Sequence, residues 1–243
     1  RLPGIGFDSA HNRAITWEHL LTQTSEWQGE CLGMPEQVEH YRRVSHDPKP
    51  PGGRKGELRA IHEPGSYWEY NDVRINQFSL ALLHLFRRPL PEVFLESVLR
   101  PIGGGADFRW EGYDDAWVEI DGRRLKSVPG GTHWGGGVSI SARDQARIGQ
   151  LMVDNGEHQG KPREWIQRMQ SPCAVAPFYG WLTWLNGDGR LFAEASRRSW
   201  FMFGAGGHLV WIEPDHEAVV VARWLDGAHS DGFVRRVVQA LGS

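Results

Sequence analysis

The feature of this 243-residue chain that most constrains its fold is a change in the spacing of its apolar residues near residue 178. Before that point, apolar residues recur at the three- and four-residue intervals of amphipathic helices. Helices followed by an antiparallel meander predict an α+β fold, because a parallel sheet would need the two patterns to alternate. The aromatic and β-branched runs typical of strands are 179–185, 199–203, 208–213 and 218–224.

Four helices are predicted in the first part of the chain from the residues that begin and end them. The second of them is apolar around most of its circumference, which indicates a helix buried on several sides. The four are 16–21 with Thr16 as N-cap, Asn71 to about Arg88 stopped by Pro89, 91–100 opened by Pro91, and 142–154 with Ser141 as N-cap and Asn155-Gly156 after it.

The last part of the chain is expected to close the domain. Pro214-Asp215-His216 is predicted to turn between the last two strands, and an amphipathic helix at 233–241 is placed to cover one face of the sheet. We therefore expect residues 1–243 to form a single domain. Its helix- and loop-rich lobe would extend to about residue 175, and 176–243 would supply the strands and the closing helix.

Composition excludes several classes of function. With 27 basic and 30 acidic residues, the net charge of -3 gives no electrostatic reason to expect a nucleic-acid partner. No apolar run approaches the length of a membrane span. Cys31 and Cys173 form no zinc knuckle, although a single bridge between them stays open, and the eleven histidines fit no metal-ligand spacing. We expect no metal and no cofactor.

Five local patterns, each weak alone, occur in an order that points to one family of enzymes. The first pattern is 15–25, which begins Ile15-Thr16-Trp17-Glu18-His19-Leu20-Leu21. The third is the buried helix from Asn71 with the turn Pro101-Ile102-Gly103 that follows it. Together they resemble the segments of class C β-lactamase-related and penicillin-binding-protein-like serine hydrolases. The other three patterns are 64–72, which is similar to that family's P-G-x-x-x-x-Y-S-N, 134–144, similar to G-G-G-x-x-S-T-A-x-D, and 204–208, similar to G-H-G-G-Q.

The resemblance implies a β-lactamase/transpeptidase-like fold, in which an antiparallel sheet flanked by helices packs with a helical lobe. It also implies a mechanism. The serine of an S-x-x-K motif attacks an acyl carbon with help from the lysine, and a tyrosine relays the proton to the leaving group. Backbone N–H groups hold the oxyanion.

Carried onto this chain, the resemblance implies two catalytic residues and a set that binds substrate or the oxyanion. Tyr70 corresponds to the relaying tyrosine, and Asp72 stands where the family usually has Asn. Each also has a plain structural interpretation: Tyr70 would close a loop, and Asp72 would be the N-cap of the helix that follows. The second set is Gly206, Gly207 and His208, for which a glycine-rich turn without a function is the alternative, together with His133 and Trp134, which would line the cleft.

The chain departs from the family at two places. No serine is followed by a lysine three residues later, and in the family that motif precedes the segment that Ile15 begins here. We therefore expect the motif upstream of Arg1, so that the chain is truncated at its N-terminal side and inactive by itself. Ala205 falls where G-H-G-G-Q has its histidine.

These patterns predict a bacterial-type serine hydrolase that cleaves a small-molecule amide or ester through an acyl-enzyme intermediate. The alternative is a non-catalytic binding module on a degenerate version of the fold, for instance one for carbohydrate, because the chain has twelve tryptophans. Oligomeric state and compartment stay open, and so does the choice of substrate, since one fold hosts many activities.

Overall fold

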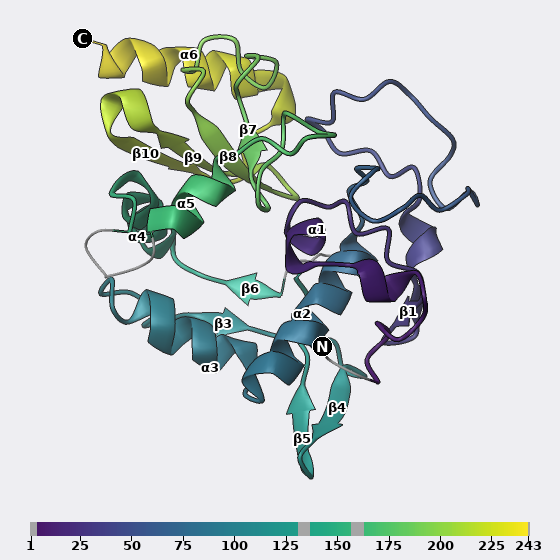
Figure 1. Ribbon diagram of the computed structural model, residues 1–243. Coiled ribbons are helices and arrows are strands. Elements are labelled where there is room, and N and C mark those ends of the chain that lie inside the picture. Colours follow the sequence, from purple (N-terminus) through teal and green to yellow (C-terminus); the bar gives the residue numbers. More distant parts are fainter. Residues whose placement is uncertain (1–3, 131–136, 157–162, 243) are drawn as a thin grey trace. The chain divides into compact units, whose positions relative to one another are not determined.

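The computed structural model describes residues 4–130, 137–156 and 163–242. Its contacts divide the chain into two compact units. Unit 1 consists of residues 1–97 and 108–139, and unit 2 of residues 98–107 and 140–243. Each unit therefore contains two separate stretches of sequence (Figure 1).

Unit 1 is built around one long helix, α2 (Asp72–Phe86), which the shorter elements surround. Its strands form three two-stranded antiparallel pairs, β1 with β2, β3 with β6, and β4 with β5. The other elements are η1 (Asn12–Ala14), α1 (Trp17–Leu21), β1 (Glu30–Cys31), β2 (Met34–Pro35), η2 (Glu36–Glu39), α3 (Leu90–Phe94), β3 (Arg109–Trp110), β4 (Trp117–Ile120), β5 (Arg123–Lys126) and β6 (Val138–Ser139).

Helix α2 is buried along most of its length, but it is not apolar nearly all round as the sequence predicted. Its buried residues include the polar side chains of Arg74 and Gln77, whereas Leu85 and Phe86 at its C-terminal end are exposed. It ends where Arg87 adopts a left-handed conformation, with φ of 52°, two residues before Pro89. Val73 and Leu83 pack with Trp27 and the β4–β5 hairpin to form the core of the unit. The helix thereby fixes the position of the chain that leads into its N-terminus.

Unit 2 contains a four-stranded antiparallel sheet in the order β10-β9-β8-β7. Helix α4 packs against β9 and β10, and α6 lies on the other side of these strands (Figure 1). The elements are α4 (Ala142–Val153), α5 (Arg163–Met169), β7 (Trp184–Leu185), β8 (Trp200–Gly204), β9 (His208–Glu213), η5 (Pro214–His216), β10 (Ala218–Ala222), η6 (Gly227–His229) and α6 (Ser230–Leu241), and η3 (Leu95–Leu99) crosses the boundary between the two units' sequence ranges.

The predicted α+β class is confirmed, and so are most of the predicted elements. Thr16 caps α1, Ser141 caps α4, and η5 joins β9 to β10 as a hairpin. The strand predicted at 179–185 is wrong for most of its length, because only β7 is a strand there. Gly180 donates its N–H to the carbonyl of Thr183 at 2.9 Å, so this stretch turns back on itself before β7.

Candidate active site

The first two segments that resemble the hydrolase family lie side by side in unit 1. The backbone N–H of Glu69 donates to the carbonyl of Gln23 at 3.1 Å, and that of Gly65 donates to the carbonyl of Thr24 at 2.8 Å. Gly65 has φ of +89°, and a Cβ there would lie 2.9 Å from Nε2 of His19. A glycine is therefore needed where the two segments meet.

Tyr70 stands at the end of the second segment, two residues before helix α2 begins. Its ring lies 5.4 Å from the guanidinium carbon of Arg42. Burial and the negative charge of Asp72 raise the pKa of Tyr70 to about 12, although Arg42 acts in the opposite direction. At neutral pH the phenol is protonated, so it can donate a proton to an oxygen or nitrogen placed beside it.

Asp72 is the first residue of α2 and not its N-cap, so the capping interpretation is wrong. The cap is Asn71, whose side-chain oxygen accepts the backbone N–H of Arg74 at 3.1 Å. The carboxylate of Asp72 instead accepts a hydrogen bond from Arg42, which also donates to Glu39 at 2.8 Å. Asp72 is therefore a buried, ion-paired carboxylate beside Tyr70.

A buried network of charges fixes the loop that leads to Tyr70. Arg59 contacts Glu26 at 2.6 Å and Glu69 at 2.5 Å, and Arg74 contacts Glu26 at 2.6 Å. Burial opposes ionisation of Glu26, but the hydrogen bonds and charges of the two arginines lower its pKa to about 2. The sequence analysis missed this network, since its members are scattered along the chain: Glu26, Glu36, His40, Arg59, Glu69 and Arg74.

Gly206, Gly207 and His208 lie in unit 2, at the turn between β8 and β9. Both glycines have positive φ, 86° and 78°. A Cβ on Gly207 would lie 1.9 Å from the carbonyl oxygen of Leu225, whose N–H donates to the carbonyl of Gly207 at 2.9 Å. This hydrogen bond therefore holds the turn against the chain that follows β10.

The structure brings a further residue, Trp224, against this turn, and the sequence analysis had not assigned it to the site. The indole of Trp224 lies edge-to-face on the imidazole of His208, with 4.5 Å between ring centroids. Trp224 is 78% exposed and has φ of 58°, which is unusual for so bulky a residue. The contact between Trp224 and His208 is evident only in the folded structure.

His133 and Trp134 lie outside the described residues. The described chain resumes at residue 137, and Asp144 lies in the part of it that belongs to unit 2. Its carboxylate accepts the N–H of Gly105 at 3.1 Å and a hydrogen bond from Arg147 at 2.6 Å. Burial would raise the pKa of Asp144, but these donors lower it overall. We find a structural role for this residue, which joins the two stretches of sequence in the unit.

The residues that the structure describes have no feature typical of a metal site or a membrane span. Those residues contain no group of three or more His, Cys, Asp or Glu side chains placed to hold a metal ion. In the same ranges, no helix has both the length and the apolar character that crossing a bilayer requires. Cys31 and Cys173 are free thiols, so the bridge left open by the sequence is not formed.

Comparison with known proteins gives a consistent result. The family model described as Beta-lactamase matches residues 1–240. Among solved structures, the chain is similar to a beta-lactamase from Mycobacterium bovis, with a TM-score of 0.60 and 15% identity over 94% of this chain and 73% of that one. No curated protein sequence matches the chain.

Two further structures have the same fold. One is EstCE1, a hydrolase with promiscuous acyltransferase activity, with a TM-score of 0.60 and 16% identity over 94% of this chain and 72% of that one. The other is the octameric penicillin-binding protein homologue from Pyrococcus abyssi, with a TM-score of 0.58 and 15% identity over 94% of this chain and 56% of that one. At these identities the similarity is one of fold.

Proposed function

The chain belongs to the beta-lactamase family and has its β-lactamase/transpeptidase-like fold, and we propose that it forms part of a serine hydrolase that cleaves an uncharged amide or ester. The reaction proceeds through an acyl-enzyme intermediate. A serine oxygen attacks the acyl carbon, the leaving group departs with a proton, and water then hydrolyses the acyl-serine bond.

The observation that carries the proposal is the placement of Tyr70. Its segment is hydrogen-bonded to the segment 15–25, is fixed by the Arg59 network, and ends at the N-terminus of a rigid buried helix. A protonated phenol held by surroundings of this kind suits a proton relay, because the group is positioned before substrate arrives. Tyr70 delivers a proton to the leaving group and takes up the proton of the serine.

The nucleophilic serine and its lysine come, in this proposal, from a segment outside residues 1–243. The printed sequence has no S-x-x-K, and losing such a nucleophile can reduce kcat by about 10⁶. Residues 1–243 alone are therefore expected to be inactive. In unit 2, Gly206 and Gly207 have no side chain that would shield their backbone, and the rings of His208 and Trp224 pack against each other beside them.

Charge supports an uncharged substrate over a β-lactam. Asp72 is acceptor-only when ionised, so it cannot donate to a substrate carbonyl as an asparagine would. Its negative charge also opposes the carboxylate that a penicillin carries. Ala205 offers no cation at the turn where relatives have a histidine or lysine. Short-chain esters and neutral amides carry no carboxylate, so neither the charge of Asp72 nor the missing cation at Ala205 opposes their binding.

The proposal is tested by labelling and turnover. A serine-directed phosphonate should label the protein that includes the upstream segment once per chain and abolish its hydrolysis of short-chain esters. Residues 1–243 alone should neither be labelled nor turn over ester. Stoichiometric labelling of residues 1–243 would overturn the assignment of the nucleophile. Absence of labelling in the longer protein would favour the alternative, a non-catalytic binding module.

A further inference from the structure

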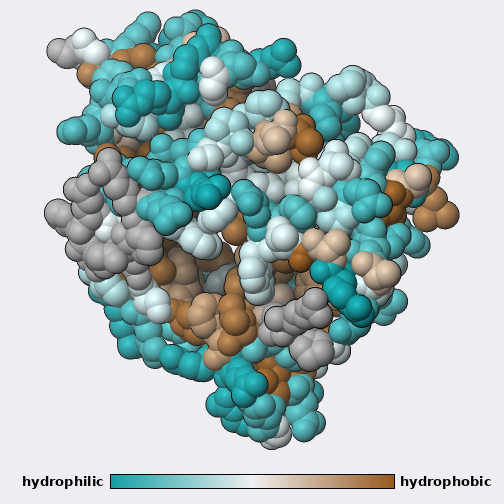
Figure 2. Space-filling model, in the orientation of Figure 1, coloured by the Kyte–Doolittle hydropathy of each residue, from teal (hydrophilic) through white to brown (hydrophobic). Residues whose placement is uncertain are grey.

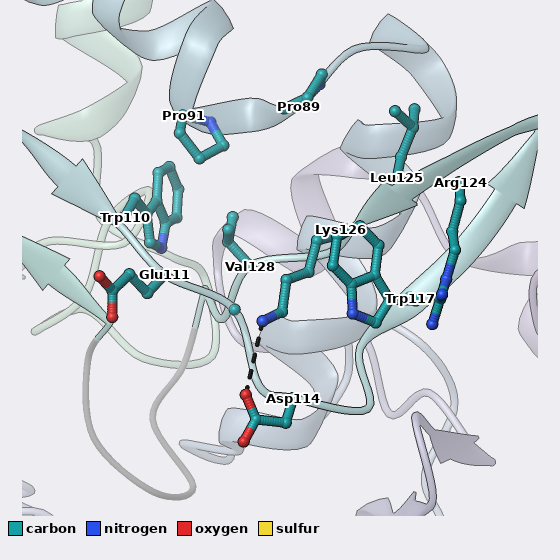
Figure 3. Close-up of a pocket in the computed structure, with 11 residues that line it drawn as sticks. Pro89, Pro91, Trp110, Glu111, Asp114, Trp117, Arg124, Leu125, Lys126 and Val128 are labelled. Carbon is teal, nitrogen blue, oxygen red and sulfur yellow. Dashed lines mark ion pairs between the residues drawn. The ribbon is translucent and has the colours of Figure 1, made fainter.

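A cavity of about 410 Å³ lies in unit 1. Its lining residues all come after helix α2 in the sequence, and the proposed mechanism uses none of them. It opens between the start of α3, strand β3 and the β4–β5 hairpin (Figure 3). In Figure 2, apolar residues are exposed over the region of α3 and β3, whereas hydrophilic residues cover most of unit 2 in the same view. The lining combines apolar walls with charged groups, which is typical of small-molecule sites.

The apolar wall is rigid. Trp110 donates its indole N–H to the carbonyl of Pro129 at 3.0 Å, and Phe94 packs edge-on against its ring with 6.2 Å between centroids. Pro91 lies beside the Trp110 ring, and Val128 lines the cavity between Trp110 and Lys126 in this view (Figure 3). A planar apolar group can lie against this wall without disturbing any hydrogen bond, because the indole N–H already has its partner.

The opposite side of the cavity carries two cations. Arg124 and Lys126 are two residues apart on β5, so their side chains share one face of the hairpin. They lie on either side of the Trp117 ring, at 4.8 and 5.5 Å from its centroid (Figure 3). Two of the protein's own positive charges therefore already lie close to that indole, which disfavours a cationic ligand there.

Lys126 has spare hydrogen-bonding capacity. Its ammonium lies 3.8 Å from the carboxylate of Asp114, beyond hydrogen-bond distance, and that carboxylate is fully exposed to water. Within the described ranges, the ammonium of Lys126 makes no hydrogen bond to another residue. A partly buried cation with all three donors available favours an anionic partner.

We propose that this cavity is a binding site for an amphipathic carboxylate, whose apolar ring lies on Trp110 and Pro91 and whose carboxylate accepts hydrogen bonds from Lys126. Arg124 adds a second positive charge at the entrance. The site goes beyond the proposed hydrolase activity and does not depend on it, because all of its residues belong to unit 1.

The test uses 2-naphthoate as the probe, with the full protein and isothermal titration calorimetry. Two matched compounds keep the ring and change only its charge: 2-naphthamide is neutral and 2-naphthylmethylammonium is positive. Naphthoate should bind at least about tenfold more tightly than either, because a charge-assisted hydrogen bond is worth that much or more. Raising the salt concentration should weaken naphthoate binding and leave the amide unchanged.

Variants on a single strand locate the site. Lys126→Met keeps most of the side-chain stem and removes the charge, so naphthoate binding should weaken at least about tenfold while the amide is unaffected. Arg123→Met is the control, because Arg123 points to the other face of β5 and donates to the carbonyl of Arg87. Circular dichroism verifies that both variants fold.

Any one of several results would overturn the proposal. They are equal affinity for naphthoate and naphthamide, naphthoate binding that survives Lys126→Met, and no binding of naphthoate at millimolar concentration. Tighter binding of a neutral oligosaccharide such as cellotriose would also overturn it. None of these outcomes bears on the hydrolase, since labelling of the serine is measured separately.

Discussion

The surroundings of the Tyr70 hydroxyl keep it protonated. Burial and the carboxylate of Asp72 both favour the neutral phenol, and together they outweigh the guanidinium of Arg42. A lysine placed next to the phenol would shift this balance toward the phenolate. Among the described residues, Arg42 is the cation in contact with the Tyr70 ring, and Asp72 and Glu39 neutralise it.

Replacing Tyr70 by Phe should therefore remove the proton relay and little else. In the protein that carries the nucleophile, kcat for ester hydrolysis should fall roughly 10²- to 10⁴-fold, the usual range for a lost acid-base group. Steady-state kinetics measures this. Tyr67→Phe is the control, because the Tyr67 ring is stacked between His62 and Arg59 and its role is packing. A larger loss in the control would show that Tyr67 is the relaying residue.

Asp72→Asn should change both the pH dependence and the choice of substrate. Removing the negative charge lowers the pKa of Tyr70, so the alkaline limb of the pH–kcat profile should move to lower pH. The ratio of kcat/KM for a penicillin to that for an ester should rise. The helix should keep its N-terminus, because Asn71 is the cap. If neither the limb nor the ratio changes, Asp72 serves only as a partner of Arg42.

At the scale of single elements, the turn between β8 and β9 depends on a glycine. Gly207→Ala places a Cβ against the carbonyl oxygen of Leu225 in a backbone conformation that alanine disfavours. We expect a loss of at least about 1 kcal/mol in the free energy of unfolding. Urea denaturation measures it.

The matched control is Gly232→Ala in helix α6. Gly232 has no neighbour within 4 Å of its Cβ position and no positive φ. Alanine is the better helix former, so this variant should gain about 0.5–1 kcal/mol. Opposite signs for the two substitutions would confirm the close approach of Leu225, whereas equal effects would contradict it.

Across unit 1, acid stability should depend on the buried ion network. The pKa of Glu26 is lowered to about 2 in the folded protein, so its contribution is fully present above the unfolded value of 4.5 and is lost as the pH falls through 2. The free energy of unfolding should drop by about 3 kcal/mol between pH ~5 and pH ~2 from this group alone.

Glu26→Gln isolates this contribution. The variant should be less stable at neutral pH, because Arg59 and Arg74 lose a buried partner, and it should lose less stability on acidification. Glu63→Gln, which changes an exposed carboxylate, is the control. Urea denaturation at several pH values measures the slopes. Parallel pH profiles for the parent and the Glu26 variant would contradict the prediction.

The sequence by itself determined the elements whose signals are local. Thr16 and Ser141 cap their helices through bonds to residues three positions on, and α2 ends at Phe86, shortly before Pro89, so short-range chemistry was enough to predict these boundaries closely. The α+β class followed from the change of hydrophobic period. The family followed from the order of five short patterns, and the match over residues 1–240 confirms it.

Only the tertiary structure decided the features that depend on contacts between distant residues. It selected Asn71 over Asp72 as the cap of α2, because packing set where the helix begins. It gathered Glu26, Arg59 and Arg74 into one buried network, and it placed Trp224 on His208. It also brought Trp110 and Lys126 together as lining residues of one cavity. Such contacts join residues up to 48 positions apart, from Glu26 to Arg74, and no local pattern encodes a pairing at that distance.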